Sequence, residues 1–91
     1  MPLARRINFK ANLTCGRVKI PVLYRHHYKL ETSQVLKVTV NIEGDWSNRE
    51  VFLTHMRKDG NLGIPERIRR RLQGSDSSLE GYCLDVTVEP A

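Results

Sequence analysis

This 91-residue sequence is poor in the features that mark secreted and membrane-spanning proteins. It has two cysteines, too few for the set of disulfides on which small secreted domains depend. No apolar run approaches the roughly 18–20 residues of a membrane-spanning helix. Arg5 and Arg6 are not followed by the apolar stretch of a signal peptide. We therefore expect a cytoplasmic globular protein with Cys15 and Cys83 as free thiols, a disulfide between them being the alternative.

The sequence also lacks the motifs of common enzymatic chemistry. It has no G-x-S-x-G, no phosphate-binding loop and no H-E-x-x-H. The cysteines do not form C-x-x-C, and His26, His27 and His55 do not form H-x-x-x-H. We therefore predict that the protein is not an enzyme, and we expect neither a metal nor a cofactor.

What the sequence has instead is an internal repeat. Gly-Arg-Val-Lys-Ile-Pro at residues 16–21 returns 44 residues later as Gly-Asn-Leu-Gly-Ile-Pro at residues 60–65. In each copy the glycine suits a tight turn, and the alternating apolar residues predict a short half-buried strand. The proline suits the first position of a helix. Two copies in the same order are a stronger signal than either copy alone.

Neighbouring segments extend each copy into a β-β-α-β unit. Before the first copy, apolar residues alternate from Ile7 to Leu13, and residues 51–56 are their counterpart. A helical segment is predicted after each proline. Leu-Lys-Val-Thr-Val at 36–40 and Leu-Asp-Val-Thr-Val at 84–88 then predict two matching strands. A chain of this length suits one domain. We expect a single domain over 1–91, with a first repeat over 7–43 and a second over 51–89.

The pattern G-x-apolar-x-I-P, a short helix and L-x-V-x-V resembles the AbrB-like swapped-hairpin regulators and, more broadly, the cradle-loop barrels. In AbrB-like proteins one such unit is a protomer, and two chains interleave. Here both units lie on one chain, so the resemblance implies a monomeric, mainly β, six-stranded pseudo-twofold barrel of the RIFT or the double-psi kind, of which we favour the RIFT kind. The Gly-Asp pair that the family often carries before the last strand is replaced by Ser33-Gln34 and Gly81-Tyr82.

Charge divides the chain unequally. Residues 1–43 hold eight Lys and Arg against two Glu, whereas residues 44–91 hold seven against eight acidic residues. Because the two halves share one pattern, the fold does not require this asymmetry. A polyanionic partner would explain it, and an ordinary basic surface is the alternative.

These features predict nucleic-acid binding, with double-stranded DNA as partner, by a protein resembling transcription regulators. Of the cations, Lys10, Arg17 and Lys19 are expected to face outward from two consecutive strands, and the resemblance supports a DNA contact at Arg17 and Lys19. The matching residues of the second copy are uncharged, which argues against a twofold operator site. The full set of expected nucleic-acid-binding residues is Arg5, Arg6, Lys10, Arg17, Lys19, Arg25 and Lys29.

Other interpretations stay open. Residues 24–29 interleave tyrosines with basic residues, which suits base stacking or, alternatively, packing of the tyrosines on the barrel. Arg67 to Arg71 suit a solvated helix face or phosphate contact. A protein-interaction adaptor would use Trp46 and the loop at 74–78 as contact points. A barrel that binds a small ligand, or an enzymatic barrel, is a third class.

Overall fold

The computed structural model describes residues 6–27, 32–45, 47–73 and 81–91. The predicted content of six strands and two short helices is confirmed. In chain order they are β1 (Ile7–Asn12), β2 (Arg17–Lys19), α1 (Val22–His27), β3 (Leu36–Ile42), β4 (Glu50–Thr54), β5 (Asn61–Gly63), α2 (Glu66–Gln73) and β6 (Cys83–Pro90). Both halves of the chain therefore have the order β-β-α-β.

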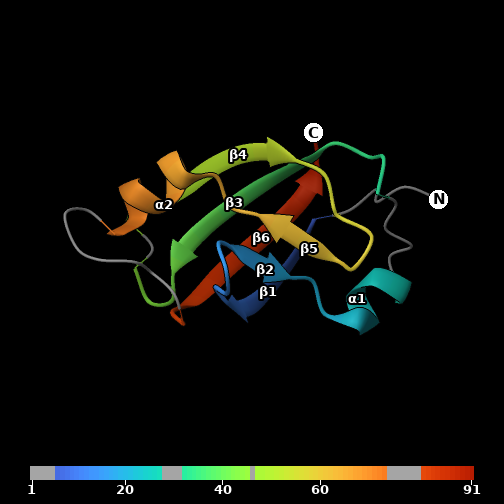
Figure 1. Cartoon of the computed structure of the whole chain (residues 1–91), viewed down its shortest axis with the longest axis horizontal. Helices are drawn as coiled ribbons and strands as arrows, with labels where there is room; N and C mark the ends of the chain where they lie inside the picture. The colour runs from blue at the N-terminus through green and yellow to red at the C-terminus, as the bar shows by residue number, and fades with distance from the viewer. Residues whose placement is uncertain (1–5, 28–31, 46, 74–80) are drawn as a thin grey trace.

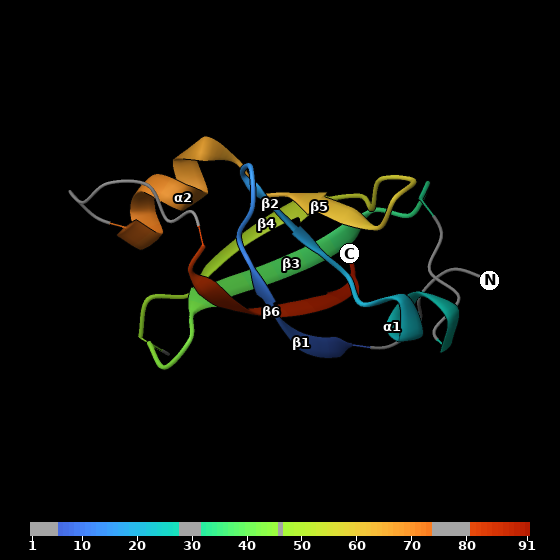
Figure 2. The same ribbon diagram turned by 60° about the horizontal axis from the view of Figure 1, so that its bottom comes forward.

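The strands form two antiparallel sheets. One has four strands in the order β1-β6-β3-β4, and the other consists of β2 and β5. The smaller sheet crosses one face of the larger one, and α1 and α2 lie at opposite ends of the molecule (Figures 1 and 2). No closed barrel is detected among the described strands, in contrast to the predicted barrel. The reason is that β2 and β5, of three residues each, pair only with each other.

The pairing register relates the two halves to each other. In the larger sheet Thr39 lies opposite Thr87, and a Val–Val pair lies on either side. In the smaller sheet Val18 lies opposite Leu62. Thr39–Thr87 and Val18–Leu62 each join equivalent positions of the two sequence repeats, and the two Val–Val pairs, Val38–Val88 and Val40–Val86, are equivalent to each other. A twofold exchange of the halves would give this arrangement.

The hydrophobic core fills the space between the sheets, as the alternation in the sequence predicts. Ile7, Phe9 and Leu13 of the first strand segment are buried, and so are the apolar residues of β2 and β5. On α2, which lies at one end, Ile68 and Leu72 point into the same core. Because β2 is so short, its attachment to the larger sheet depends on burial of a few side chains.

Each helix begins one residue after its proline. The carbonyl of Pro21 accepts hydrogen bonds from the backbone N–H groups of Tyr24 at 3.0 Å and Arg25 at 3.2 Å. The carbonyl of Pro65 does the same for Ile68 and Arg69, both at 3.0 Å. The prolines thus occupy the capping position, one residue before the position predicted for them.

The first glycine of each motif copy lies against an arginine of the other repeat. Gly16 and Gly60 have φ angles of 74° and 84°. A Cβ on Gly60 would lie 2.6 Å from Cζ and Nε of Arg25, and one on Gly16 would lie 3.3 Å from Cζ of Arg69. Each glycine therefore permits the left-handed turn and also the close approach of a guanidinium.

Replacing Gly60 with alanine is expected to lower the free energy of unfolding by about 2–5 kcal/mol. About 1–2 kcal/mol comes from placing a Cβ in the left-handed region. The remainder comes from displacing Arg25, as in other overpacked sites, where about 1–3 kcal/mol is typical. Urea unfolding measures the change.

Gly44→Ala is the matched control, because Gly44 has a φ of 88° and no atom within 4 Å of an added Cβ. This variant should lose only the stability that a Cβ in the left-handed region costs. In an Arg25→Ala background the two glycine substitutions should cost the same. Equal costs in the wild-type background would contradict the role assigned to Arg25.

Candidate nucleic-acid interface

Strand β2 presents two cations on the outer face of the smaller sheet. Val18 points into the core with 1% of its surface exposed, so its neighbours Arg17 and Lys19 project the opposite way. Their side chains line a cavity of about 380 Å³ together with polar residues of β1, β5 and the β1–β2 turn. In that lining Asn12 and Asn61 supply amide groups that can donate or accept hydrogen bonds.

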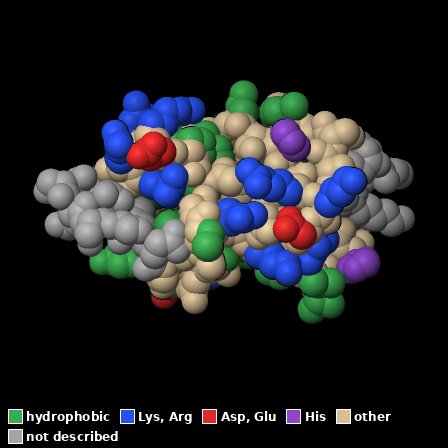
Figure 3. All heavy atoms as spheres, in the orientation of Figure 1, with side chains coloured by type: hydrophobic (Ala, Val, Ile, Leu, Met, Phe, Trp, Pro, Cys, Tyr) green, Lys and Arg blue, Asp and Glu red, His purple; other side chains and the backbone are tan. Residues whose placement is uncertain are grey.

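A third cation reaches this face from the turn before β5. The Nη2 atom of Arg57 would lie 3.6 Å from a Cβ on Gly63. Gly63 is the cross-strand partner of Arg17, and directly opposed residues project on the same side of a sheet. Arg57 therefore lies beside Arg17. We call Arg17, Lys19 and Arg57 the basic face; Figure 3 views the molecule from this side, and Lys and Arg side chains gather over β2 and β5.

No ion pair found in the described ranges engages the basic face. The ion pairs found in the described ranges are Lys10–Glu43 at 3.9 Å, Lys37–Glu89 at 3.7 Å, Arg70–Glu66 at 2.8 Å and Arg71–Glu50 at 3.2 Å. None of them involves Arg17, Lys19 or Arg57. The cations of this face are therefore not held in ion pairs.

One carboxylate, that of Asp59, lies close to the basic face. The backbone N–H of Asn61 donates a hydrogen bond to it at 3.2 Å. This hydrogen bond is the main cause that lowers the pKa of Asp59, and the charge of Arg17 adds to the effect. Asp59 is therefore ionised at neutral pH, and it offsets part of the positive charge of Arg17.

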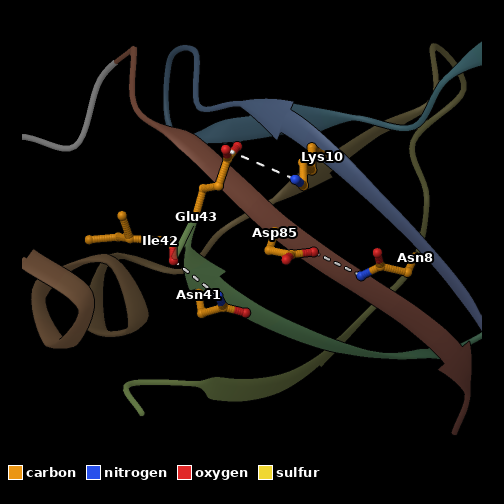
Figure 4. A network of polar contacts seen from close by, with 6 residues as sticks. All are labelled: Asn8, Lys10, Asn41, Ile42, Glu43 and Asp85. Carbon is orange, nitrogen blue, oxygen red and sulfur yellow. Dashed lines mark hydrogen bonds and ion pairs between the residues drawn. The ribbon is translucent and has the colours of Figure 1, made fainter. Parts of the chain in front are cut away.

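The structure places Lys10 away from Arg17 and Lys19, although the sequence predicts one shared surface. Lys10 lies on the outer face of the larger sheet, where its Nζ faces Glu43 near the buried Asp85 (Figure 4). The reason is topological. β1 and β2 are consecutive strands, but they belong to different sheets, whose outer faces point in opposite directions.

The polar network around Asp85 differs in character from the basic face. Asn8 donates to the Asp85 carboxylate at 2.9 Å, and Asn41, opposite Asp85 in the register, donates to the carbonyl of Ile42 at 3.0 Å. Figure 4 shows these amide groups beside the Lys10–Glu43 pair. With its cation already paired, this network offers no unpaired positive charge to a polyanion.

The other predicted contacts are dispersed. Arg25 lies against Gly60, next to Asn61, and thus at one end of the basic face. Its Nε is buried and has no hydrogen-bond partner among the residues that the structure covers. Arg6 is exposed just before β1. Arg5 and Lys29 lie outside the described residues.

The alternative contact points are tested only in part. Tyr24 packs against the core, with its ring 6.1 Å from that of Phe9, which agrees with the packing interpretation. Arg70 and Arg71 of α2 are engaged in ion pairs. Tyr28, Trp46 and the loop at 74–78 lie outside the described residues.

Sequence reasoning missed Arg57. It lies in a turn between β4 and β5, where charged residues are ordinary. The available signal was Gly63, which occupies the outward position that Lys19 holds in the first copy. A glycine at an outward strand position leaves room for a neighbouring side chain, and Arg57 uses that room.

Cys15 and Cys83 form no disulfide; Cys15 is exposed and Cys83 is half-buried. A hydrogen bond to the Glu43 carboxylate, together with burial, raises the pKa of the Cys83 thiol, which therefore stays protonated at neutral pH. In the described ranges no three His, Cys, Asp or Glu side chains gather as metal ligands. Within those same ranges, no helix has the length and apolar character needed to cross a membrane.

No protein-family model matches the chain, and neither the curated proteins nor the solved structures include a significant match to it.

Proposed function

We propose that the protein binds nucleic acid, with double-stranded DNA as partner, through phosphate contacts from the basic face. The observation that carries the proposal is that Arg17, Lys19 and Arg57 lie on one face and form no ion pair among the described residues, whereas Lys10, Lys37, Arg70 and Arg71 are paired. A guanidinium can donate two parallel hydrogen bonds to a phosphate. Contacts of this kind fix the position of a protein on nucleic acid without reading the bases.

The spacing on β2 suits a phosphate backbone. Arg17 and Lys19 are two residues apart in a strand, so their Cα atoms are about 6.6 Å apart. Asn12 and Asn61 line the adjacent cavity and can donate to phosphate or base oxygens. In this proposal the protein acts in transcription. We expect it to tolerate different DNA sequences, because the second repeat offers no matching pair of cations on β5 for a twofold operator site.

We further propose that the chain is an internally duplicated relative of the AbrB-like regulators and cradle-loop barrels. The repeated order of elements and the equivalent pairing of the halves support this proposal. In it, the β1–β2 and β4–β5 connections pass between the sheets as they would in a flattened RIFT-type barrel. One chain would then supply both of the units that two protomers supply in AbrB-like proteins, and the protein would act as a monomer.

Titration of labelled random-sequence duplex DNA, followed by anisotropy at several salt concentrations, tests the proposal. We expect roughly micromolar binding at low salt, since non-specific binding has dissociation constants of about 10⁻⁴–10⁻⁶ M at physiological salt. Three phosphate contacts predict a slope of log K against log salt of about −3. Absence of binding at low salt, or affinity that salt does not change, would refute it. Single-stranded DNA and RNA of the same sequence identify the preferred form.

A further inference from the structure

A second cavity, of about 480 Å³, lies beside the basic face. It is bounded by the end of β4, the β1–β2 turn and the start of α2, and its lining includes Arg57, Arg69, His55 and Thr54. Its volume lies within the range of about 300–1,000 Å³ that is usual for ligand sites. Two arginines, an imidazole and a hydroxyl thus converge on one cavity.

Both guanidiniums of this cavity pack against glycines. Arg69 lies against Gly16, where an added Cβ would approach its Cζ to 3.3 Å, and its Nε donates to the carbonyl of Ile64 at 3.1 Å. Arg57 lies against Gly63. The two glycines are close neighbours, since Ile64 donates a backbone hydrogen bond to the carbonyl of Gly16 at 2.9 Å. Both guanidiniums therefore border one short stretch of backbone.

The charges of the lining favour an anion. The lining contains one carboxylate, that of Glu66, and its Oε1 is engaged by Arg70 at 2.8 Å. Arg57 and Arg69 have no carboxylate partner within the part of the chain that the structure describes. The Nε–H of Arg69 donates to the carbonyl of Ile64, and this hydrogen bond orients the guanidinium beside the cavity.

We propose that this cavity binds a single phosphate group, either as free inorganic phosphate or as the terminal phosphate of a nucleotide. Arg57 and Arg69 would contact the phosphate oxygens from two sides, and the Thr54 hydroxyl or the His55 N–H would donate to a third. Paired guanidiniums suit phosphate because each can make two parallel charge-assisted hydrogen bonds. The site goes beyond the proposed function, because it binds one phosphate in a cavity and requires no strand lying across β2.

Titration of ¹⁵N-labelled protein with inorganic phosphate at constant ionic strength tests the site. We expect saturable shifts of the backbone amides of Gly16 and Gly63 and of the Nε–H of Arg69. Arg57→Ala should weaken binding at least about tenfold, as loss of a charge-assisted hydrogen bond predicts. Arg57 is exposed, so this variant should fold even if Arg69→Ala does not.

Arg67→Ala is the matched control. Arg67 is an exposed arginine of α2, the helix that carries Arg69, but it does not line the cavity. Shifts that do not saturate, or equal weakening by Arg67→Ala and Arg57→Ala, would overturn the proposal. Adenosine 5′-monophosphate, compared with adenosine, distinguishes the source of the phosphate. Tighter binding of the monophosphate than of inorganic phosphate assigns a nucleotide, and the reverse order assigns free phosphate. Arg17→Ala/Lys19→Ala protein should keep the phosphate shifts even where it loses duplex DNA.

Discussion

Replacing Arg17 and Lys19 together with alanine is expected to weaken duplex DNA binding roughly 50-fold at 0.1 M salt. Each phosphate contact that is lost removes about 0.9 from the slope of log K against log salt, and at 0.1 M salt this equals about 0.9 log units of affinity. The slope should therefore flatten from about −3 to about −1. Both side chains project from the outer face of the smaller sheet, so the substitutions should leave the fold unchanged. Anisotropy titrations at several salt concentrations measure both quantities.

Lys10→Ala/Lys37→Ala is the matched control for this double variant. It removes the same two charges from the outer face of the larger sheet, where Lys10 faces Glu43 and Lys37 faces Glu89. If binding is confined to the basic face, the control should retain the wild-type slope. Equal flattening in the two double variants would mean that net charge alone governs binding, and it would remove the reason for assigning a face.

The contrast between Lys10 and Arg17 shows what an alternating pattern can and cannot predict. Alternation identifies the outward residues of a strand, because successive side chains point to opposite faces. It correctly placed Phe9 and Val18 in the core and their neighbours outside. It does not say which sheet a strand joins. That choice depends on pairing between distant segments, β1 with β6 and β2 with β5. As a result, Lys10 and Arg17 lie on the outer faces of different sheets, on opposite sides of the molecule.

The same limit explains the missing barrel and the missed arginine. The repeat correctly indicated six strands, but closure depends on how far each hydrogen-bonded ladder extends, and β2 and β5 end after three residues. Arg57 reaches the basic face only because Gly63, six residues later, lies opposite Arg17 in the folded sheet. Local sequence signals correctly predicted the six strands and the two helices. The composition of the candidate site depends on contacts that no local pattern encodes.

Replacing Leu62 with alanine is expected to lower the free energy of unfolding by about 2–5 kcal/mol, the usual cost of a large cavity in a core. Leu62 is fully buried and lies opposite Val18, so this pair holds the smaller sheet onto the larger one. For a domain of this size each kcal/mol lowers the melting temperature by about 4–8 °C. Calorimetry or urea unfolding measures the loss, which is large relative to a total stability of about 5–15 kcal/mol.

Leu53→Ala removes the same atoms at a position with 64% of its surface exposed, and it should change stability by no more than about 0.5 kcal/mol. Comparable losses in the two variants would contradict the core described here. The Leu62 variant also bears on function. Arg17 and Lys19 flank Val18, and burial of Val18 against its neighbours fixes the direction in which both cations project. Loosening of the smaller sheet should therefore weaken DNA binding at temperatures where most molecules are still folded, whereas Leu53→Ala should leave affinity unchanged.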